Sequence, residues 1–294
     1  MLRTIIVLAA AIAATPSLAQ LEHLQLPRGN GSVIDYSIDA PLHKPEGVLL
    51  LAQGSGCLPT ARNANLATVR AAFPGYIAVM VEKYGIAPDA AISDGFVDCP
   101  PAFHAGHTVS QRVADYETVM ATLPVNLPLV LFGGSEGGLA VAMLTNRLKP
   151  KAAIILSSAT GIPFGEMVLS TIPPEGQDQV RRGLAAAAAD PTGLTMFAGS
   201  SHRFWADILQ HLPADYMLRS SSPLLVLQGG LDTSSPVAAA RITADRFAAA
   251  KLCTLTYWEF PGLDHGMADP TGRSHMAEIA AAAAAWAAIP TPGC

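Results

Sequence analysis

Short, mostly apolar runs alternate along the chain with longer stretches of helical periodicity. A run that is apolar at every position is typical of a strand buried on both faces of a parallel sheet. Strands are predicted at Gly47–Ala52, Tyr76–Val81, Leu129–Phe132, Ala153–Leu156, Leu224–Leu227 and Leu255–Phe260. Helices are predicted over Asn65–Phe73, Val109–Leu123, Leu139–Leu148, Val237–Lys251 and Ser274–Ala288. The alternation predicts an α/β fold with a mostly parallel central sheet and helices on both faces.

Local motifs mark the ends of some elements. Asn30–Gly31 between the alternating stretches Leu21–Leu26 and Ser32–Ile38 predicts a β-hairpin ahead of the parallel strands. Thr108, with Gln111 three residues later, has the spacing of a capping box and predicts a helix start.

The stretch 162–222 interrupts the alternation, because it contains helical patterns but no clear buried strand. A long segment between two core strands, on the ligand side of a sheet, is typical of a cap or lid. We therefore expect a core formed by residues 20–161 and 223–294, with the cap inserted between them. The aromatic side chains of Phe164, Phe204 and Trp205 make these residues candidates for substrate binding.

The first 19 residues have the pattern of a secretory signal peptide. A single basic residue, Arg3, precedes the apolar run Thr4–Ala14, and small residues follow up to Ala19. A membrane anchor would need about 20 apolar residues, more than this run provides. We expect cleavage between Ala19 and Gln20 and export of the mature chain to the periplasm or the medium, with no membrane span left in it.

Composition excludes several classes of protein. The 294 residues include 18 basic and 23 acidic side chains, a net charge of −5, whereas nucleic-acid binding requires clustered positive charge. Half of the residues are hydrophobic, which is too many for a disordered chain. The positive mean hydropathy of +0.34 is explained by the signal peptide, alanine-rich helices and buried strands.

The four cysteines predict disulfides rather than a metal site. Cys57, Cys99, Cys253 and Cys294 form no C-x-x-C pair, so a zinc cluster is not expected. An even number of cysteines in an exported chain favours two disulfides, for which three pairings are possible. Proximity along the chain favours Cys57–Cys99 and Cys253–Cys294. No metal or cofactor is expected.

A glycine-rich motif surrounds Ser135. Gly133-Gly134-Ser135-Glu136-Gly137-Gly138 lies directly between a predicted buried strand and a predicted helix. G-x-S-x-G in this context is the nucleophile elbow, in which a tight turn exposes the serine Oγ. Ser135 is therefore the candidate nucleophile.

A serine nucleophile needs a base and an orienting carboxylate. Asp232 follows the strand Leu224–Leu227, and His265 follows the last strand. His104 and His107 lie on the same side of the predicted sheet but precede the serine, which does not fit the chain order Ser…Asp…His. We therefore predict Asp232 and His265 as the partners of Ser135.

An oxyanion hole needs two backbone N–H groups. One is expected from Glu136, directly after the nucleophile. The other is expected from the loop Gln53-Gly54-Ser55-Gly56 after the first buried strand, with Ser55 as the first candidate and Gly56 as the second.

These motifs, together with Gly229-Gly230-Leu231-Asp232 and Asp264-His265-Gly266, resemble those of the α/β-hydrolase fold superfamily over nearly the whole mature chain. The resemblance implies the same triad, the same oxyanion amides and a helical cap. The sequence departs from the family pattern at Gln53, where many members of the superfamily have histidine.

The expected activity is hydrolysis of a small-molecule carboxylic ester through an acyl-enzyme. The same groups could cleave an amide, a peptide or a thioester, and a catalytically silent binding protein is the non-enzyme alternative. An aminopeptidase would need a carboxylate to hold the substrate amine, for which Glu82, Glu136 and Glu166 are candidates. The substrate and the oligomeric state stay open.

Overall fold

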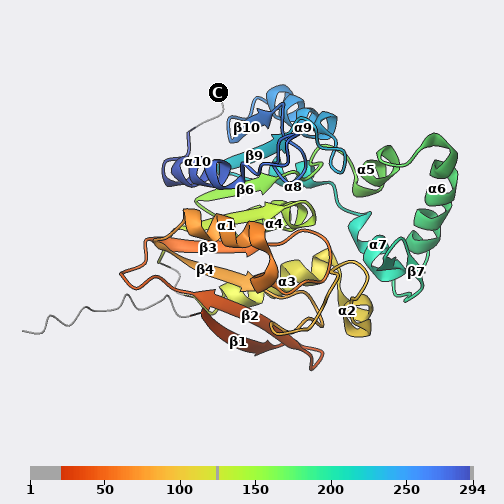
Figure 1. Ribbon diagram of the computed structural model, residues 1–294, viewed down its shortest axis with the longest axis horizontal. Helices are drawn as coiled ribbons and strands as arrows, with labels where there is room; N and C mark the ends of the chain where they lie inside the picture. The colour runs from red at the N-terminus through yellow and green to blue at the C-terminus, as the bar shows by residue number, and fades with distance from the viewer. Residues whose placement is uncertain (1–20, 124–125, 292–294) are drawn as a thin grey trace, which may run out of the picture.

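The computed structural model describes residues 21–123 and 126–291, and within these ranges eight strands form one sheet in the order β1-β2-β4-β3-β5-β6-β9-β10 (Figure 1). The strands are β1 (Leu21–Pro27), β2 (Val33–Asp39), β3 (Gly47–Ala52), β4 (Tyr76–Val81), β5 (Leu129–Gly134), β6 (Ala152–Leu156), β9 (Leu224–Gly229) and β10 (Leu255–Phe260). The sheet is parallel from β4 to β10, and β2 runs antiparallel to both β1 and β4. The predicted α/β class and mostly parallel sheet are confirmed.

Helices cover both faces of the sheet. One face is covered by α1 (Ala64–Ala72) and α10 (Met276–Ala288), which also contact each other. The other face is covered by α3 (Val109–Met120), α4 (Glu136–Leu148), α8 (Pro213–Met217) and α9 (Val237–Ala249). Every residue of β3, β6 and β9 is buried, which explains why these strands are almost uniformly apolar.

Several element boundaries differ from the sequence-based expectation. Helix α4 begins at Glu136 rather than Leu139, because it starts directly after the Ser135 turn, where glycines hide the helical pattern. The Thr108 hydroxyl accepts from the Gln111 N–H, as predicted, but the Gln111 side chain bonds Asp115 instead of completing the capping box. The short elements η1 (Thr60–Arg62) and α2 (Pro101–Gly106) were not predicted.

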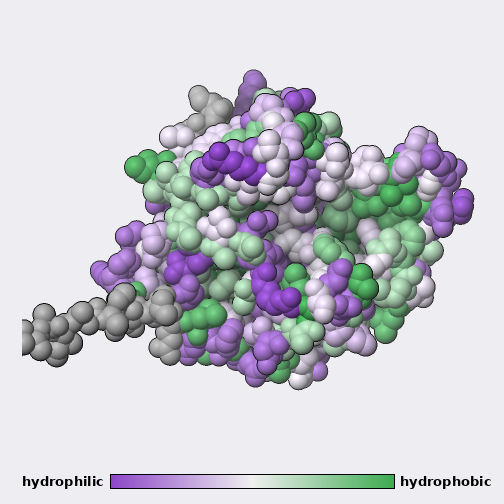
Figure 2. Space-filling view, in the orientation of Figure 1, coloured by the Kyte–Doolittle hydropathy of each residue, from purple (hydrophilic) through white to green (hydrophobic). Residues whose placement is uncertain are grey.

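Residues 157–223 connect β6 to β9, and the stretch 162–222 within them is called the insertion below. It contains α5 (Phe164–Ser170), α6 (Pro174–Ala188), β7 (Met196–Phe197), β8 (Ser200–Ser201), α7 (His202–Ile208) and α8. Helices α5 to α7 stand beyond the carboxyl ends of the parallel strands (Figure 1), whereas α8 packs against α4 in the helical layer. Figure 2 shows hydrophobic side chains gathered where the insertion faces the core.

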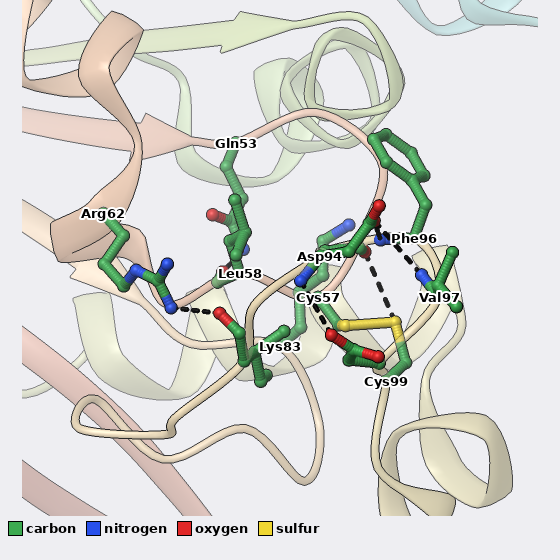
Figure 3. The surroundings of a disulfide bond; sticks show 12 residues. Gln53, Cys57, Leu58, Arg62, Lys83, Asp94, Phe96, Val97 and Cys99 are labelled. Carbon is green, nitrogen blue, oxygen red and sulfur yellow. Dashed lines mark hydrogen bonds between the residues drawn. A yellow bond between two sulfur atoms is a disulfide. The ribbon is translucent and has the colours of Figure 1, made fainter.

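A disulfide joins the loops that follow β3 and β4. Cys57 and Cys99 are bonded with an S–S distance of 2.14 Å, and the Cys57 N–H donates to the Gly95 carbonyl at 2.7 Å (Figure 3). The second predicted pair cannot be compared, because Cys294 lies outside the described residues, as does the predicted signal peptide 1–19. Within the described ranges, no helix is long and apolar enough to cross a membrane.

Candidate active site

Ser135 occupies the turn between β5 and α4. Its backbone has φ +53° and ψ −123°, a conformation that costs free energy for any residue with a Cβ. Its N–H donates to the Leu156 carbonyl at 2.9 Å, which ties the turn to the neighbouring strand β6. The amino end of α4 follows at once, and its positive end favours negative charge near Ser135. This is the geometry of a nucleophile elbow.

The glycines of the motif make this turn possible. A Cβ on Gly137 would lie 2.2 Å from the Ala52 carbonyl oxygen, and a Cβ on Gly133 would lie 2.2 Å from the Gly137 carbonyl oxygen. Both distances are shorter than non-bonded contact allows, and both involve backbone atoms that cannot rotate away. Helix α4 can therefore approach β3 and β5 this closely only with glycine at these positions.

Replacing Gly137 with alanine is expected to lower the free energy of unfolding by at least about 1–3 kcal/mol, the usual cost of overpacking. Gly134→Ala is the matched control in the same motif, because its Cβ would meet nothing closer than 3.8 Å. Denaturant unfolding of both variants measures the difference. Equal stability of the two would show that the close approach of α4 is not required.

Asp232 and His265 meet beside the same edge of the sheet. The His265 Nδ1 lies 2.9 Å from the Asp232 Oδ2, and the Asp232 side chain is fully buried. The other carboxylate oxygen of Asp232 accepts from the N–H groups of Ser234 and Ser235 at 2.8 and 2.7 Å. With Nδ1–H bound to the carboxylate, the His265 Nε2 is free to accept a proton.

Ser135 and His265 line one cavity of about 290 Å³, together with Gly54 and Ser55. The other two histidines considered from the sequence lie elsewhere. His107 is buried between the rings of Phe103 and Phe204, at centroid distances of 4.5 and 5.5 Å, and His104 lies on α2.

The two candidate oxyanion amides flank Ser135. Glu136 is the first residue of α4, so its N–H has no partner within the helix. Gly54 lies against the nucleophile, since its Cβ would be 3.3 Å from the Ser135 Cβ, and among the described residues the N–H of Ser55 has no backbone acceptor. Gly56 instead lies against the disulfide loop, where its Cβ would be 2.7 Å from the Gly95 carbonyl oxygen. The geometry therefore favours Ser55 over Gly56.

A buried charge cluster, which the sequence did not predict, surrounds the Glu136 carboxylate. Its Oε1 lies 2.9 Å from the Lys83 Nζ, 3.1 Å from the Arg112 Nη1 and 3.3 Å from the His107 Nε2. The Lys83 Nζ also donates to the Gly54 carbonyl at 2.8 Å. Lys83 therefore connects the loop after β3 with the start of α4, the two segments that carry the candidate oxyanion amides. Figure 3 shows its side chain beside the disulfide loop.

Burial and the neighbouring charges together set the protonation state of each group in this cluster. Burial raises the pKa of Glu136, but Lys83, His107 and Arg112 outweigh burial and hold that pKa well below its usual range. Burial lowers the pKa of Lys83 to about 8, against the attraction of Glu136. Burial, with Lys83 nearby, lowers the pKa of His107 to about 4. At neutral pH the cluster thus contains an ionised Glu136, a protonated Lys83 and a neutral His107.

The three aromatic residues singled out in the insertion lie together. Phe164 contacts Trp205 at a centroid distance of 5.9 Å, and Trp205 contacts Phe204 at 5.6 Å. All three line a cavity of about 270 Å³ that Ser55 and Glu136 also line. The aromatic side chains therefore lie close to the candidate oxyanion amides.

Solved structures of low sequence identity share this fold. Est1E from Butyrivibrio proteoclasticus is 17% identical over 90% of this chain and 96% of its own, with a TM-score of 0.61. A lipase in its open form is 17% identical over 92% of this chain and 100% of its own, with a TM-score of 0.62. A puromycin-hydrolyzing peptidase from Mycobacterium tuberculosis is 18% identical over 92% of this chain and 39% of its own, with a TM-score of 0.59.

No protein-family model matches the chain, and no curated protein is similar to it in sequence at a significant level. The likeness to these solved structures is therefore one of overall fold, and it extends over about nine-tenths of the chain. The chain has the α/β-hydrolase fold.

Proposed function

We propose that the protein is a serine hydrolase that cleaves a small carboxylic ester through an acyl-enzyme on Ser135. The Ser135 Oγ attacks the acyl carbon while His265 Nε2 takes its proton and then gives it to the leaving alkoxide, which departs as the alcohol. Water then attacks the acyl-enzyme, His265 takes a proton from it and returns one to the Ser135 Oγ, and the carboxylic acid leaves.

The observation that carries this proposal is the buried Asp232 bonded to His265 beside the cavity that Ser135 lines. Asp232 would hold the imidazole in the tautomer that accepts a proton at Nε2 and would stabilise the imidazolium. The N–H groups of Ser55 and Glu136 would stabilise the oxyanion of each tetrahedral intermediate.

The carboxylates of the site favour an ester over an amino-terminal peptide substrate. An aminopeptidase needs a carboxylate that is free to bind the substrate amine. Glu136 is occupied by Lys83 and Arg112, and Glu82 is buried and accepts from the N–H and the hydroxyl of Thr60. Glu166, on α5, is exposed and does not line the cavity of Ser135 and His265. Amide or thioester hydrolysis by the same groups is the second candidate.

The signal-like residues 1–19 and the Cys57–Cys99 disulfide support export, because disulfides persist in oxidising compartments. The proposed location is the periplasm or the extracellular medium.

A fluorophosphonate probe is expected to label the native protein at Ser135, and p-nitrophenyl esters are expected to be hydrolysed faster than aminoacyl anilides. Labelling is detected by mass spectrometry of the modified peptide, and hydrolysis by absorbance. Absence of labelling would favour a silent binding protein. Turnover of anilides alone would overturn the ester assignment in favour of a peptidase.

A further inference from the structure

Three cavities border the residues of the proposed site, and they differ in size and lining. One of about 20 Å³ is lined by Ser135, Glu136 and Met167, and has room for little more than a water molecule. One of about 290 Å³ is lined by both Ser135 and His265. The third, of about 270 Å³, is lined by Ser55 and Glu136 but by neither Ser135 nor His265. Only the two larger cavities can hold a substituent of the substrate.

Proton transfer assigns these two cavities to opposite halves of an ester. His265 must reach the leaving oxygen to protonate it, so the alcohol half has to lie on the side of the cavity that His265 lines. The acyl half is bonded to the carbon whose oxygen the amides of Ser55 and Glu136 would hold. It therefore lies on the side that those two residues line without His265.

We infer that the 270 Å³ cavity, the acyl cavity, binds an uncharged aromatic acyl group, so that the substrates are esters of aryl-substituted carboxylic acids with small alcohols. This inference rests on the proposed function.

The lining of the acyl cavity fits an aromatic ring. Phe103, Phe164, Phe204 and Trp205 supply aromatic surface, against which a ring can pack in stacked or edge-to-face geometry. Apolar cavities of about 150 Å³ hold benzene, so 270 Å³ holds a ring with a short linker. The ionisable groups that line it are Glu136, which is neutralised by Lys83, and His107, whose pKa burial lowers to about 4. A charged acyl group would therefore find no counter-ion there.

Contacts within the core and contacts within the insertion both fix the walls of the acyl cavity. On the core side, Gly56 and Cys99 belong to the two loops that the Cys57–Cys99 disulfide joins (Figure 3). On the insertion side, Trp205 donates from its Nε1 to the Phe197 carbonyl at 2.8 Å, which fixes the orientation of its ring. A pocket with fixed walls discriminates by shape, because it does not collapse around smaller groups.

Two isomeric esters test the inference directly. Methyl 3-phenylpropanoate has the ring in the acyl half, and 2-phenylethyl acetate has the same atoms with the ring in the alcohol half. The native protein is expected to hydrolyse the first with a kcat/KM at least about tenfold higher, the scale on which apolar pockets discriminate. Acid release in a pH-stat measures both rates. A ratio of one or below would overturn the inference.

Trp205→Leu and Trp286→Leu form a matched pair of variants. The two tryptophans are 5% and 7% exposed, but Trp286 lies on α10, on the opposite face of the sheet. Trp205→Leu is expected to bring the ratio of kcat/KM toward one, and Trp286→Leu to leave it unchanged. If Trp205→Leu does not fold, Phe164→Leu replaces it. An unchanged ratio in the folded acyl-cavity variant would overturn the assignment of this cavity.

Fluorophosphonate labelling of Ser135 separates failure of the inference from failure of the proposed function. Labelling together with a ratio of one, or with hydrolysis of neither ester, would overturn the aromatic acyl site and leave a serine hydrolase of another specificity. Absence of labelling would overturn both.

Discussion

Ser135→Ala is expected to lower kcat for ester hydrolysis by about 10⁴- to 10⁶-fold, the range found when a serine nucleophile is removed from a triad. The hydroxyl oxygen is the only atom lost, and alanine has the same Cβ at the same φ of +53°, so the backbone strain of the turn is unchanged. The free energy of unfolding should therefore stay close to that of the native protein. Steady-state rates and denaturant unfolding measure the two quantities.

Ser222→Ala is the matched control for this prediction. Ser222 is buried and precedes β9 at the end of the sheet opposite the site, so removal of its hydroxyl should leave kcat and labelling unchanged. Equal fluorophosphonate labelling of Ser135→Ala and the native protein would contradict the assigned nucleophile.

Most of the fold could be predicted because burial requires a recognisable pattern of apolar residues within each strand and helix. Gly47–Ala52 and Tyr76–Val81 are strands over the predicted ranges, since a strand covered on both faces must be apolar at nearly every position. The closeness of Asp232 and His265 was also accessible from the sequence, because parallel strands bring the residues that follow them to one edge. Asp232 and His265, far apart in the chain, are thus hydrogen-bonded in the structure.

The charge cluster could not be predicted, because its members share no local pattern. From the sequence, His107 was a competing base and Glu136 a candidate amine ligand, whereas the structure places them 3.3 Å apart. Lys83 is the second residue after β4, at the sheet edge where functional residues were expected, and this position was the only sign in the sequence that Lys83 belongs to the site. Which of several polar residues at a sheet edge become buried together depends on side-chain packing.

Lys83→Met is expected to lower the free energy of unfolding by about 1–3 kcal/mol, because the Gly54 carbonyl loses its buried donor while Arg112 still pairs with Glu136. Lys83 and Glu136 have side chains that are 0% and 2% exposed, so water cannot replace the lost ammonium group. The variant should also lose kcat by about 10- to 100-fold, somewhat less than removal of an oxyanion-hole donor costs. The reason is that the Gly54 carbonyl loses its donor beside the Ser55 amide.

Arg28→Met separates a loss of stability from a loss of catalytic geometry. Arg28 and Asp115 form another buried pair, with side chains 6% and 3% exposed, that touches neither candidate oxyanion loop. This variant should be destabilised at least as strongly, with kcat unchanged under conditions in which the protein is folded. An equal kcat in Lys83→Met and Arg28→Met would show that Lys83 has a structural role alone.

The double variant Lys83→Met/Glu136→Gln distinguishes the two contacts of the Lys83 ammonium group. Arg112 still neutralises Glu136 in Lys83→Met, so replacing the carboxylate as well leaves the buried Arg112 charge unpaired, and the lost stability should not return. The Gly54 carbonyl still has no donor, so kcat should stay low. Recovery of kcat in the double variant would mean that the Glu136 charge, rather than the bond to the Gly54 carbonyl, controls the oxyanion loop. A kcat as low as that of Lys83→Met, measured where the protein is folded, would support Lys83 as the residue that positions the Ser55 amide.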